Sequence, residues 1–322
     1  METKNLKFGA TYPTLDLGTD PAVLRDWAVG MESIGFDEIF IPEHVIGINA
    51  GLRPDWEPLN PNTLKKDKPI YDHTNPFFEP FVAMGFLAAV TSRIMLTSGV
   101  MIAPQRQTAL IAKQAAIADV LSRGRIRLGV GVGWNDAEFE AMGADFRVRG
   151  RRMDEQIDLL RRLWTEESVT YSGRFDTFEA AGVCPMPIQR PIPLIIGGDS
   201  DPAMERAAAR GDGWFLTHTA AECVDRTSRF WKRVDELGRR DGMSLVGTIY
   251  QGTRPAQAML DDVAAWADLG ATHLNIRTAT YPIQWSEGRL VRKTNVDGHL
   301  EALRDLRQAW AALCPTSSGG TP

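Results

Sequence analysis

Short apolar runs alternate with amphipathic helical stretches eight times along the 322-residue chain. Alternation of this kind is typical of a parallel β-sheet covered by helices. Eight strand–helix units favour an α/β fold of the (β/α)8 TIM-barrel type, because a doubly wound sheet usually stops at about five to seven strands. The predicted strands are residues 6–12, 37–42, 94–101, 126–132, 193–197, 213–217, 245–251 and 273–277. Helices are predicted at residues 21–34, 78–90, 109–121, 153–164, 202–210, 221–240, 255–269 and 296–313.

Two insertions interrupt the repeat. Residues 45–77 follow the second predicted strand and are rich in proline, asparagine and lysine. Connections in such folds usually have about 2 to 6 residues, so this insertion is predicted to be a lid over the strand ends. Residues 169–187, between strands four and five, alternate aromatic and polar residues around Ser172 and Gly173, which predicts a small hairpin. We expect a single barrel domain over residues 1–313 and a flexible tail at 314–322.

The charge balance and the apolar content exclude several classes of protein. Lys and Arg total 36 against 41 Asp and Glu, giving a net charge of -5, which argues against nucleic acid as a partner. No apolar run approaches the roughly 18 residues of a membrane span, and the charged N-terminus does not resemble a signal peptide. Cys184, Cys223 and Cys314 have neither disulfide nor zinc spacing. We therefore expect a cytoplasmic protein without a membrane partner.

Two of the five histidines follow the C-terminal ends of predicted strands. In a TIM barrel these ends build the active site, and the opposite end serves stability. His44, preceded by Glu43, follows the second strand, and His218 follows the sixth. We therefore predict that all three residues face the catalytic mouth. Structural roles are predicted for the other histidines, His73, His273 and His299.

A glycine-containing turn follows the fifth predicted strand. Gly197, Gly198, Asp199 and Ser200 lead into a helix that has Asp201 as its predicted N-cap and Pro202 at its first position. Glycines and free N–H groups at a helix start can bind phosphate. The alternative is an ordinary tight turn, and the two acidic residues so close to a phosphate argue against the binding role.

Glycines also recur at alternate positions of the fourth predicted strand, at Gly129, Gly131 and Gly133. Alternate glycines leave one face of a strand without side chains, so a flat or bulky group can lie against the backbone there. The alternative is a narrow corner of the barrel. At the end of the third strand, Gly99 and Val100 follow Ser98, and small residues of this kind suit a bulge or strained peptide under a ligand.

Metal-ligating and paired-carboxylate patterns are weak in this sequence. The first strand ends in Thr11 and Tyr12 and has no His-x-His pair, so the ligands of metal-dependent TIM-barrel hydrolases are missing. Asp136, Glu138 and Glu140 are interpreted as the polar face of a helix start. We therefore predict no metal site.

Three long blocks of sequence resemble the luciferase-like monooxygenase family of flavin and deazaflavin oxidoreductases. They are residues 92–143, 149–164 and 191–214, and they include RGRIRLGVGVGW and GGDS. These two motifs are most similar to the branch that depends on coenzyme F420. The likeness covers almost the whole chain and implies a TIM barrel, usually a homodimer, that holds a tricyclic ring over the strand C-termini.

The resemblance also implies roles for individual residues. The acid–histidine pair of the family maps onto Glu43 and His44, with His44 exchanging a proton beside the reacting atom. A non-prolyl cis peptide maps onto Gly99–Val100. The cofactor phosphate is expected at the turn after strand five, helped by the backbone of the glycine strand. The expected cofactor contacts are Thr11, Gly99, Val100, Gly131, Gly133, Trp134, Gly197, Gly198, Asp199, Ser200 and His218.

Two departures from the F420-dependent dehydrogenases limit what can be carried over. Those enzymes have Asp where this chain has Glu43, and Glu where it has Trp134, so their alcohol-oxidising mechanism is not assumed. Aromatic residues of the insertions and late loops, together with Arg277, are expected to contact a small organic substrate. They are Trp56, Tyr71, Tyr281 and Trp285, although loop packing explains such aromatics equally well, and the alternative for Arg277 is a surface ion pair.

The predicted function is F420-dependent oxidoreduction, with hydride transfer between reduced deazaflavin and the substrate. The first alternative is an FMN-dependent two-component monooxygenase, which uses O2 and reduced flavin supplied by a separate reductase. A non-catalytic flavin-binding relative and a metal-dependent hydrolase are more distant alternatives.

Overall fold

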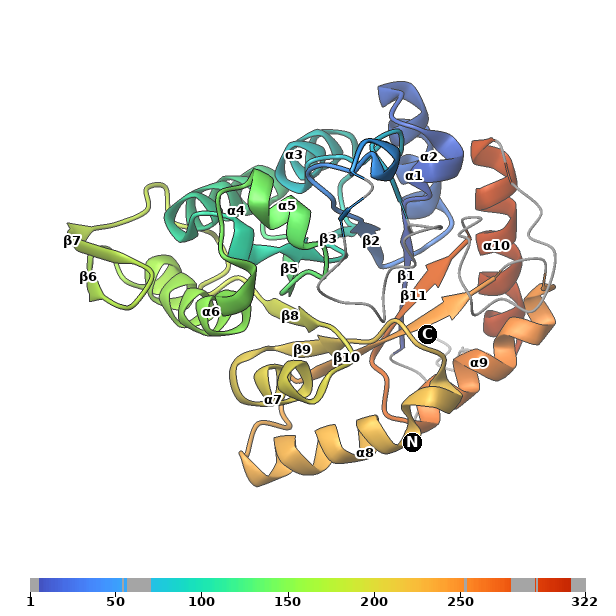
Figure 1. The fold of residues 1–322 in the computed structure, drawn as a ribbon. Coiled ribbons are helices and arrows are strands. Elements are labelled where there is room, and N and C mark those ends of the chain that lie inside the picture. The colour runs from blue at the N-terminus through green and yellow to red at the C-terminus, as the bar shows by residue number, and fades with distance from the viewer. Residues whose placement is uncertain are drawn as a thin grey trace.

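The strands form a closed parallel barrel, which confirms the predicted fold class (Figure 1). The computed structural model describes residues 6–53, 55–56, 71–251, 254–278, 293 and 295–313. The sheet order is β3-β2-β1-β11-β10-β9-β8-β5, and pairing of β3 with β5 closes the barrel. The barrel strands are β1 (Lys7–Thr11), β2 (Glu38–Ile41), β3 (Met95–Ser98), β5 (Ile126–Gly131), β8 (Leu194–Gly197), β9 (Gly213–Phe215), β10 (Ser244–Tyr250) and β11 (His273–Arg277).

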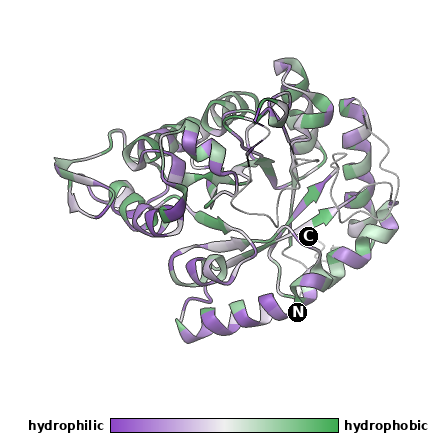
Figure 2. Ribbon diagram, in the orientation of Figure 1, coloured by the Kyte–Doolittle hydropathy of each residue, from purple (hydrophilic) through white to green (hydrophobic). Residues whose placement is uncertain are grey.

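Helices surround the barrel and alternate polar and apolar residues along their length (Figure 2). Side chains cap the N-termini of some of these helices: Asp20 caps the helix before β2, and Ser200 caps the helix that follows β8. The N-cap there is Ser200 and not Asp201, one residue earlier than predicted. The long helices are α2 (Pro21–Ser33), α3 (Pro80–Val90), α4 (Thr108–Ser122), α6 (Arg149–Thr165), α7 (Asp201–Arg210), α8 (Ala220–Glu236), α9 (Ala256–Asp268) and α10 (Val296–Leu313).

Short elements occupy several connections between strands and helices. The helices α1 (Thr14–Leu17) and α5 (Asp136–Ala141) follow β1 and β5 at the C-terminal end of the barrel. The part of the chain that the structure describes also contains the single-turn helices η2 (Ala50–Leu52), η3 (Ala103–Gln105) and η4 (Phe146–Val148). Because α1 and α5 lie at the end where active sites of this fold are built, they can place side chains in the mouth.

The third predicted strand is interrupted at the cis peptide bond between Gly99 and Val100. This confirms the position expected for a non-prolyl cis bond. Before it, β3 pairs with β5 at Leu96 and Thr97; after it, β4 (Met101–Ile102) pairs with β5 higher up the barrel. The single strand predicted over residues 94–101 is therefore two short strands with a bulge between them.

Side chains of the bulge fill the space that the glycines leave. A Cβ atom built on Gly131 would lie 2.9 Å from Val100 Cγ2, and one built on Gly197 would lie 2.8 Å from Val100 Cγ1. A Cβ atom on Gly133 would lie 2.7 Å from Ile102 Cγ2. These contacts are closer than real Cβ atoms make, so the glycines are needed for the packing of Val100 and Ile102. The glycine-lined face is therefore occupied by the protein itself and not left open for a ligand.

The inserted segments differ in how much of them the structure describes. Strands β6 (Val169–Ser172) and β7 (Thr177–Ala181) pair antiparallel and project from the barrel as a hairpin, where a hairpin is predicted (Figure 1). Residues 54 and 57–70 of the predicted lid, and the predicted tail at 314–322, lie outside the described residues. Among the helices that the structure describes, none is long and apolar enough to cross a membrane.

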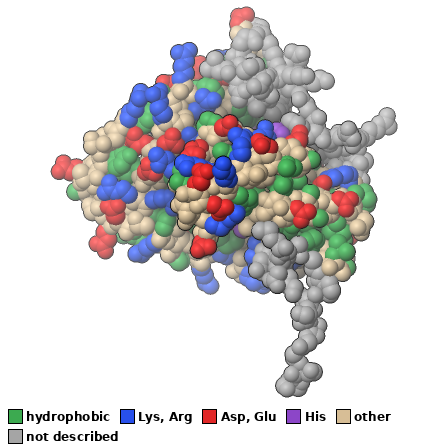
Figure 3. Space-filling view, turned by 90° about the horizontal axis from the view of Figure 1, so that it is seen from below, with side chains coloured by type: hydrophobic (Ala, Val, Ile, Leu, Met, Phe, Trp, Pro, Cys, Tyr) green, Lys and Arg blue, Asp and Glu red, His purple; other side chains and the backbone are tan. Residues whose placement is uncertain are grey.

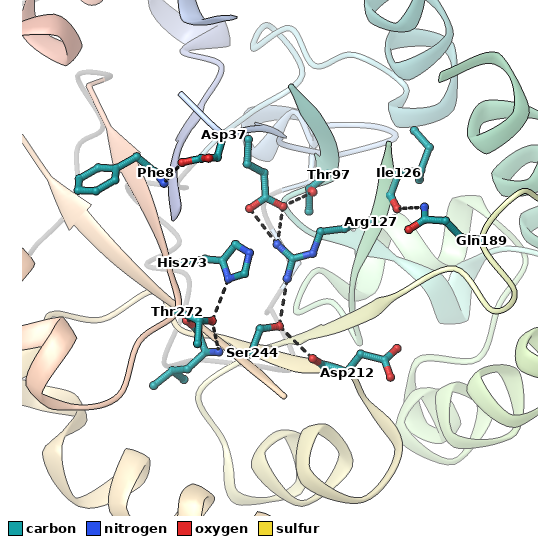
Figure 4. Close-up of polar contacts among 12 residues, drawn as sticks. Phe8, Asp37, Thr97, Ile126, Arg127, Gln189, Asp212, Ser244, Thr272 and His273 are labelled. Atoms are coloured by element: carbon teal, nitrogen blue, oxygen red, sulfur yellow. Dashed lines mark hydrogen bonds and ion pairs between the residues drawn. The ribbon is translucent and has the colours of Figure 1, made fainter. Parts of the chain in front are cut away.

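A polar network crosses the barrel interior at the N-terminal ends of the strands (Figure 4). Arg127 Nη1 lies 2.7 and 2.9 Å from the two carboxylate oxygens of Glu38, and Arg127 Nη2 donates to Ser244 Oγ at 3.0 Å. Thr97 Oγ1 also donates to Glu38. His273 is nearby, and burial followed by the charge of Arg127 lowers its pKa to about 4. The four side chains that bond to one another come from β2, β3, β5 and β10, so the network links four strands at the stability end of the barrel.

Charged side chains on the face seen in Figure 3 are interspersed by sign, with Lys and Arg beside Asp and Glu. Exposed ion pairs such as Arg233–Glu205 and Arg162–Glu166 are of this type. Pairs of this kind contribute only about 0 to 1 kcal/mol each to stability. The fold therefore depends on the buried interior, where Trp27, Trp164, Trp214 and Trp266 are among the largest fully buried side chains.

Candidate active site

The His44 side chain lies at the C-terminal end of the barrel, directly after β2, and 16% of its area is exposed. Its Nδ1 atom lies 3.3 Å from Oε2 of Glu138, a residue of the short helix α5. The other oxygen of the same carboxylate accepts the backbone N–H of Val45. The structure therefore joins the loop after β2 to the helix after β5 through one carboxylate.

Aromatic rings surround the imidazole of His44. The ring of Tyr71 is stacked on it at a centroid distance of 3.7 Å, and the rings of Phe77 and Trp134 approach it edge-on at 5.0 and 5.6 Å. The hydroxyl of Tyr71 donates to Glu138 Oε2 at 3.3 Å and accepts from Asn135 Nδ2 at 2.8 Å. Tyr71, predicted to contact substrate, is thus buried and packs against the imidazole of His44. A direct contact of Tyr71 with substrate stays a prediction.

Glu138 was not predicted as a site residue, and its interpretation as a solvated helix face is wrong. Its side chain is completely buried, whereas the side chain of Glu140, two residues later, is 69% exposed and pairs with Arg53 at 3.0 Å. Ala137 and Phe139 on either side are also buried. Two signals were available: an acid between apolar neighbours, and a helix that starts directly after a barrel strand.

Glu43, the residue before His44, is also buried. Its Oε2 accepts the backbone N–H of Ile102 at 2.6 Å, and its Oε1 pairs with Arg106, which also binds Glu79 at 2.9 Å. Burial raises the pKa of the Glu43 carboxyl to about 7, against the opposing charge of Arg106. Both oxygens are bound to residues of the segment after the cis peptide, so Glu43 joins the loop after β2 to that segment. This geometry suits a structural role. A catalytic role for Glu43 stays a prediction.

The turn after β8 brings Asp199 to His218. Asp199 Oδ2 lies 3.1 Å from His218 Nδ1 and accepts from Thr217 Oγ1 at 2.8 Å. Burial opposes ionisation of Asp199, but the hydrogen bonds and charge of His218 and Thr217 lower its pKa; the bond to Asp199 raises the pKa of His218. Asp201 pairs with Arg229 at 2.9 Å. Near the predicted phosphate position, Asp199 is therefore paired with a histidine and Asp201 with an arginine.

Buried polar groups that fit a heterocyclic ring lie between β1 and β11. Thr11 Oγ1 donates to Asn275 Oδ1 at 2.8 Å, and Asn275 is completely buried. The amide Nδ2 of Asn275 has no hydrogen-bond partner among the described residues. A buried amide nitrogen without an acceptor is costly, so it suits a ligand carbonyl or a water. Asn275 was not predicted as a site residue, although it lies two positions before Arg277 in β11 and therefore on the same face of that strand.

A pocket adjoins these groups. Its wall includes Thr11, Thr14, Pro42, Phe77 and Arg277. The guanidinium of Arg277 lies 5.9 Å from the ring centroid of Tyr250. The predicted substrate contact Arg277 therefore lies beside Thr11, a predicted cofactor contact. Trp56, another predicted substrate contact, donates from Nε1 to Asp136 at 3.4 Å.

The remaining predicted residues fall into two groups. Gly197, Gly198 and Ser200 form the turn into α7, and Gly198 adopts a φ of +117°, which favours glycine. Tyr281 and Trp285 lie outside the described residues. Among the residues that the structure describes, no group of three or more His, Cys, Asp or Glu could hold a metal ion.

A family model described as luciferase-like monooxygenase matches residues 8–313. The chain belongs to the luciferase-like monooxygenase family. It is therefore an oxidoreductase, in agreement with the prediction from sequence. The match covers the barrel together with both insertions.

Curated relatives of this luciferase-like chain include an uncharacterized protein of Mycobacterium tuberculosis, 29% identical over 270 residues, covering 84% of this chain and 90% of the relative. The FMNH(2)-dependent dimethylsulfone monooxygenase of Pseudomonas putida is 34% identical over 135 residues, covering 41% of this chain and 37% of the relative.

Solved structures share the fold of this luciferase-like protein at low identity. An F420-dependent secondary alcohol dehydrogenase in complex with an F420-acetone adduct has a TM-score of 0.72 at 15% identity, covering 94% of this chain and 98% of that one. DmoA from Hyphomicrobium sulfonivorans has a TM-score of 0.68 at 15% identity, covering 99% and 90%. The relatives therefore include enzymes named for each of the two cofactors.

Proposed function

We propose that the protein is an F420-dependent oxidoreductase that transfers a hydride between the deazaflavin and a small organic substrate. The observation that carries the proposal is the His44 imidazole, held against the buried Glu138 carboxylate at the strand C-termini. Hydride addition to a carbonyl or imine leaves an electron pair that needs a proton, and a histidine is well suited to supply it.

The proposed ring site is the space bordered by Thr11, Asn275 and the Gly99–Val100 bulge. The amide nitrogen of Asn275 and the hydroxyl of Thr11 would bind polar edge atoms of the ring. The turn at Gly197–Ser200, where His218 contacts Asp199, would receive the phosphate. When bound, a deazaflavin supplies hydride chemistry, and a reduced flavin supplies reaction with O2.

The chain's own residues then contribute orientation, exclusion of water and a proton. The aromatic rings of Tyr71, Phe77 and Trp134 shield His44 on several sides. With its Nδ1 directed to Glu138, His44 presents Nε2 as the atom that exchanges the proton with substrate. Arg277, at the pocket wall, is proposed to bind a negatively charged group of the substrate or cofactor.

FMN-dependent monooxygenation is the second candidate. It is favoured by the 34% identity to a dimethylsulfone monooxygenase that is named for its dependence on FMNH(2). Such an enzyme would need a separate reductase as a partner. The two candidates share one site, so the cofactor must be tested directly.

Fluorescence titration of the purified protein with oxidised F420 and, separately, with FMN tests the proposal. We expect micromolar binding of F420 and much weaker binding of FMN, followed by turnover of enones, imines or nitro compounds with reduced F420. Tight FMN binding without F420 binding would overturn the proposal in favour of the second candidate. His44→Asn is the matched variant: it should bind F420 like the wild type but lose turnover, whereas a non-catalytic relative would bind and never turn over.

We also propose that the protein forms a homodimer in the cytoplasm. The adjacent helices α3 and α4 expose apolar side chains, with Val82 71% and Leu110 48% exposed. A contiguous apolar patch favours a protein contact, and we propose that Val82 and Leu110 belong to one such patch. Light scattering of the wild type and of Val82→Glu measures the oligomeric state: a dimer that Val82→Glu dissociates supports the proposal, and a wild-type monomer contradicts it.

A further inference from the structure

Glu138 holds an unusual position for a carboxylate, because it is completely buried and lies within ion-pair distance of a histidine. It receives hydrogen bonds from three directions: from His44, from the hydroxyl of Tyr71, and from the backbone of Val45. Among the described residues, His44 is also the ion-pair partner of Glu138. Buried charge is costly unless it is paired, and the His44 imidazole is placed to pair with this carboxylate.

The hydrogen-bond directions decide which nitrogen of His44 carries hydrogen. An ionised carboxylate only accepts hydrogen bonds, so Nδ1, at 3.3 Å from Glu138 Oε2, is the donor. Tyr71 accepts from Asn135 and therefore has its own hydrogen directed to the same carboxylate. The imidazole is left with Nε2 for exchange with another molecule.

Other charged groups near His44 are already paired. Glu43, the preceding residue, is bound to Arg106 and to the Ile102 N–H on the segment after the cis peptide. Among the described residues, Tyr71 of the lid segment and Glu138 of α5 are titratable groups that contact the imidazole. The α5 helix also favours a negative charge in its first turn, where Glu138 lies.

We propose that Glu138 is a positioning residue, which fixes the tautomer of His44 and stabilises its imidazolium form for proton transfer through Nε2. The inference rests on the proposed role of His44 in catalysis but not on the identity of the cofactor. It assigns a function to a buried acid of α5 that the sequence analysis interpreted as part of a polar helix face.

Substitutions that separate charge from shape test the proposal. Glu138→Gln keeps the size but removes the charge, and its amide can donate to Nδ1 and select the wrong tautomer. Glu138→Asp keeps the charge but removes a methylene from a packed side chain. A positioning role predicts that Gln is worse than Asp for turnover, whereas a purely structural role predicts the reverse. Glu140→Gln, on the exposed face of the same helix, is the matched control.

We expect Glu138→Gln to lower kcat by about 10²- to 10⁴-fold, the range for loss of a positioned acid–base group or its orienting carboxylate. As the pH rises, we expect Glu138→Gln to lose activity at a lower pH than the wild type does, because the imidazolium of His44 is no longer stabilised. The kcat of Glu138→Asp should fall between those of Glu138→Gln and the wild type. The kcat of Glu140→Gln should match the wild type. Equal activity and equal pH profiles for Glu138→Gln and Glu140→Gln would overturn the proposal.

A measurement without cofactor keeps this test separate from the proposed function. Nitrogen-detected NMR of the free protein, with His44 assigned by its loss in His44→Asn, gives the tautomer and the titration midpoint of His44. We expect the Nδ1–H tautomer in the wild type and a midpoint shifted to lower pH in Glu138→Gln. An Nε2–H tautomer in the wild type would overturn the proposal even if Glu138→Gln did not fold. Failure of F420 and FMN to bind would contradict only the proposed function.

Discussion

Buried ionisable side chains occupy both ends of the barrel, but they are attached to different parts of the fold. At the N-terminal end, Glu38 and Arg127 lie on barrel strands and bond to other strand residues (Figure 4). At the C-terminal end, Glu138 and Arg106 lie on a short helix and a loop, and they hold loop residues. Strand residues are fixed by the sheet, whereas loops can differ in conformation between proteins. The comparison indicates that the first network stabilises the closed barrel and that the second arranges the site.

The two ends also differ in how completely polar atoms are satisfied. Both carboxylate oxygens of Glu38 and the Nη atoms of Arg127 have partners. Around the mouth, Asn275 Nδ2 and both side-chain polar atoms of Gln105 are buried without a partner among the described residues. Unsatisfied buried groups are expected where a ligand or water completes the bonding. The following changes test whether the two ends separate function from stability.

The largest expected effect is at the mouth. His44→Asn should lower kcat/KM by about 10²- to 10⁴-fold, because it removes the proton-exchanging group. The unfolding midpoint in urea should stay close to the wild-type value. Loss of stability of the same size as the loss of activity would contradict the assignment of His44 to function.

Arg127→Met should have the converse effect at the other end. It leaves Glu38 buried and unpaired, which costs about 3 to 5 kcal/mol in the free energy of unfolding. The double variant Glu38→Leu/Arg127→Met should recover most of that loss, because apolar residues of similar volume replace buried pairs well. Urea denaturation measures both variants, and affinity for cofactor serves as the control. An Arg127→Met protein as stable as the wild type would show that the network is not a stabilising element.

Packing between the two ends can be tested at Gly131. Gly131→Ala should destabilise the protein by about 1 to 3 kcal/mol, because the added methyl group meets Val100. The cost should fall in a Val100→Ala background, and the double-mutant cycle gives the coupling energy. Gly85→Ala in α3, where a Cβ meets no atom within 4 Å, is the matched control and should be neutral or stabilising by about 0.5 to 1 kcal/mol. An absent coupling would mean that Val100 does not fill this space.

The pH dependence of stability from His273 tests the N-terminal end of the barrel without removing a buried partner. Its folded pKa of about 4 lies below the ordinary value of 6.5, so the unfolded chain takes up a proton first as the pH falls. Stability should therefore decrease between about pH 6.5 and 4, by at most about 1.4 kcal/mol per pH unit from this group. His273→Gln should show a shallower decrease than the wild type. Other titrating groups contribute equally to both proteins, so the difference between the two stability curves isolates His273. Glu43 is one such group, and its raised pKa increases stability as the pH falls.

The strands and long helices could be predicted because each carries its own periodicity. Positions at the barrel mouth were predictable where a residue follows a strand, as His44 and Asp199 do, and the family resemblance predicted the cis bond at Gly99–Val100. Glu138 and Asn275 were missed for physical reasons. The six residues of α5 are too few to show which face is buried, and the contact of Glu138 with His44 joins positions 94 residues apart. The bond from Thr11 to Asn275 spans 264 residues.

The packing of Val100 against Gly131 and Gly197 also affects how mutational scans of this fold should be interpreted. In a scan of single substitutions, each of these glycines would score as intolerant, although the cause is one valine side chain. A library that varies Val100 together with the glycines would reach sequences that no single step allows. Redesign of the mouth for another substrate should therefore treat these positions as one unit.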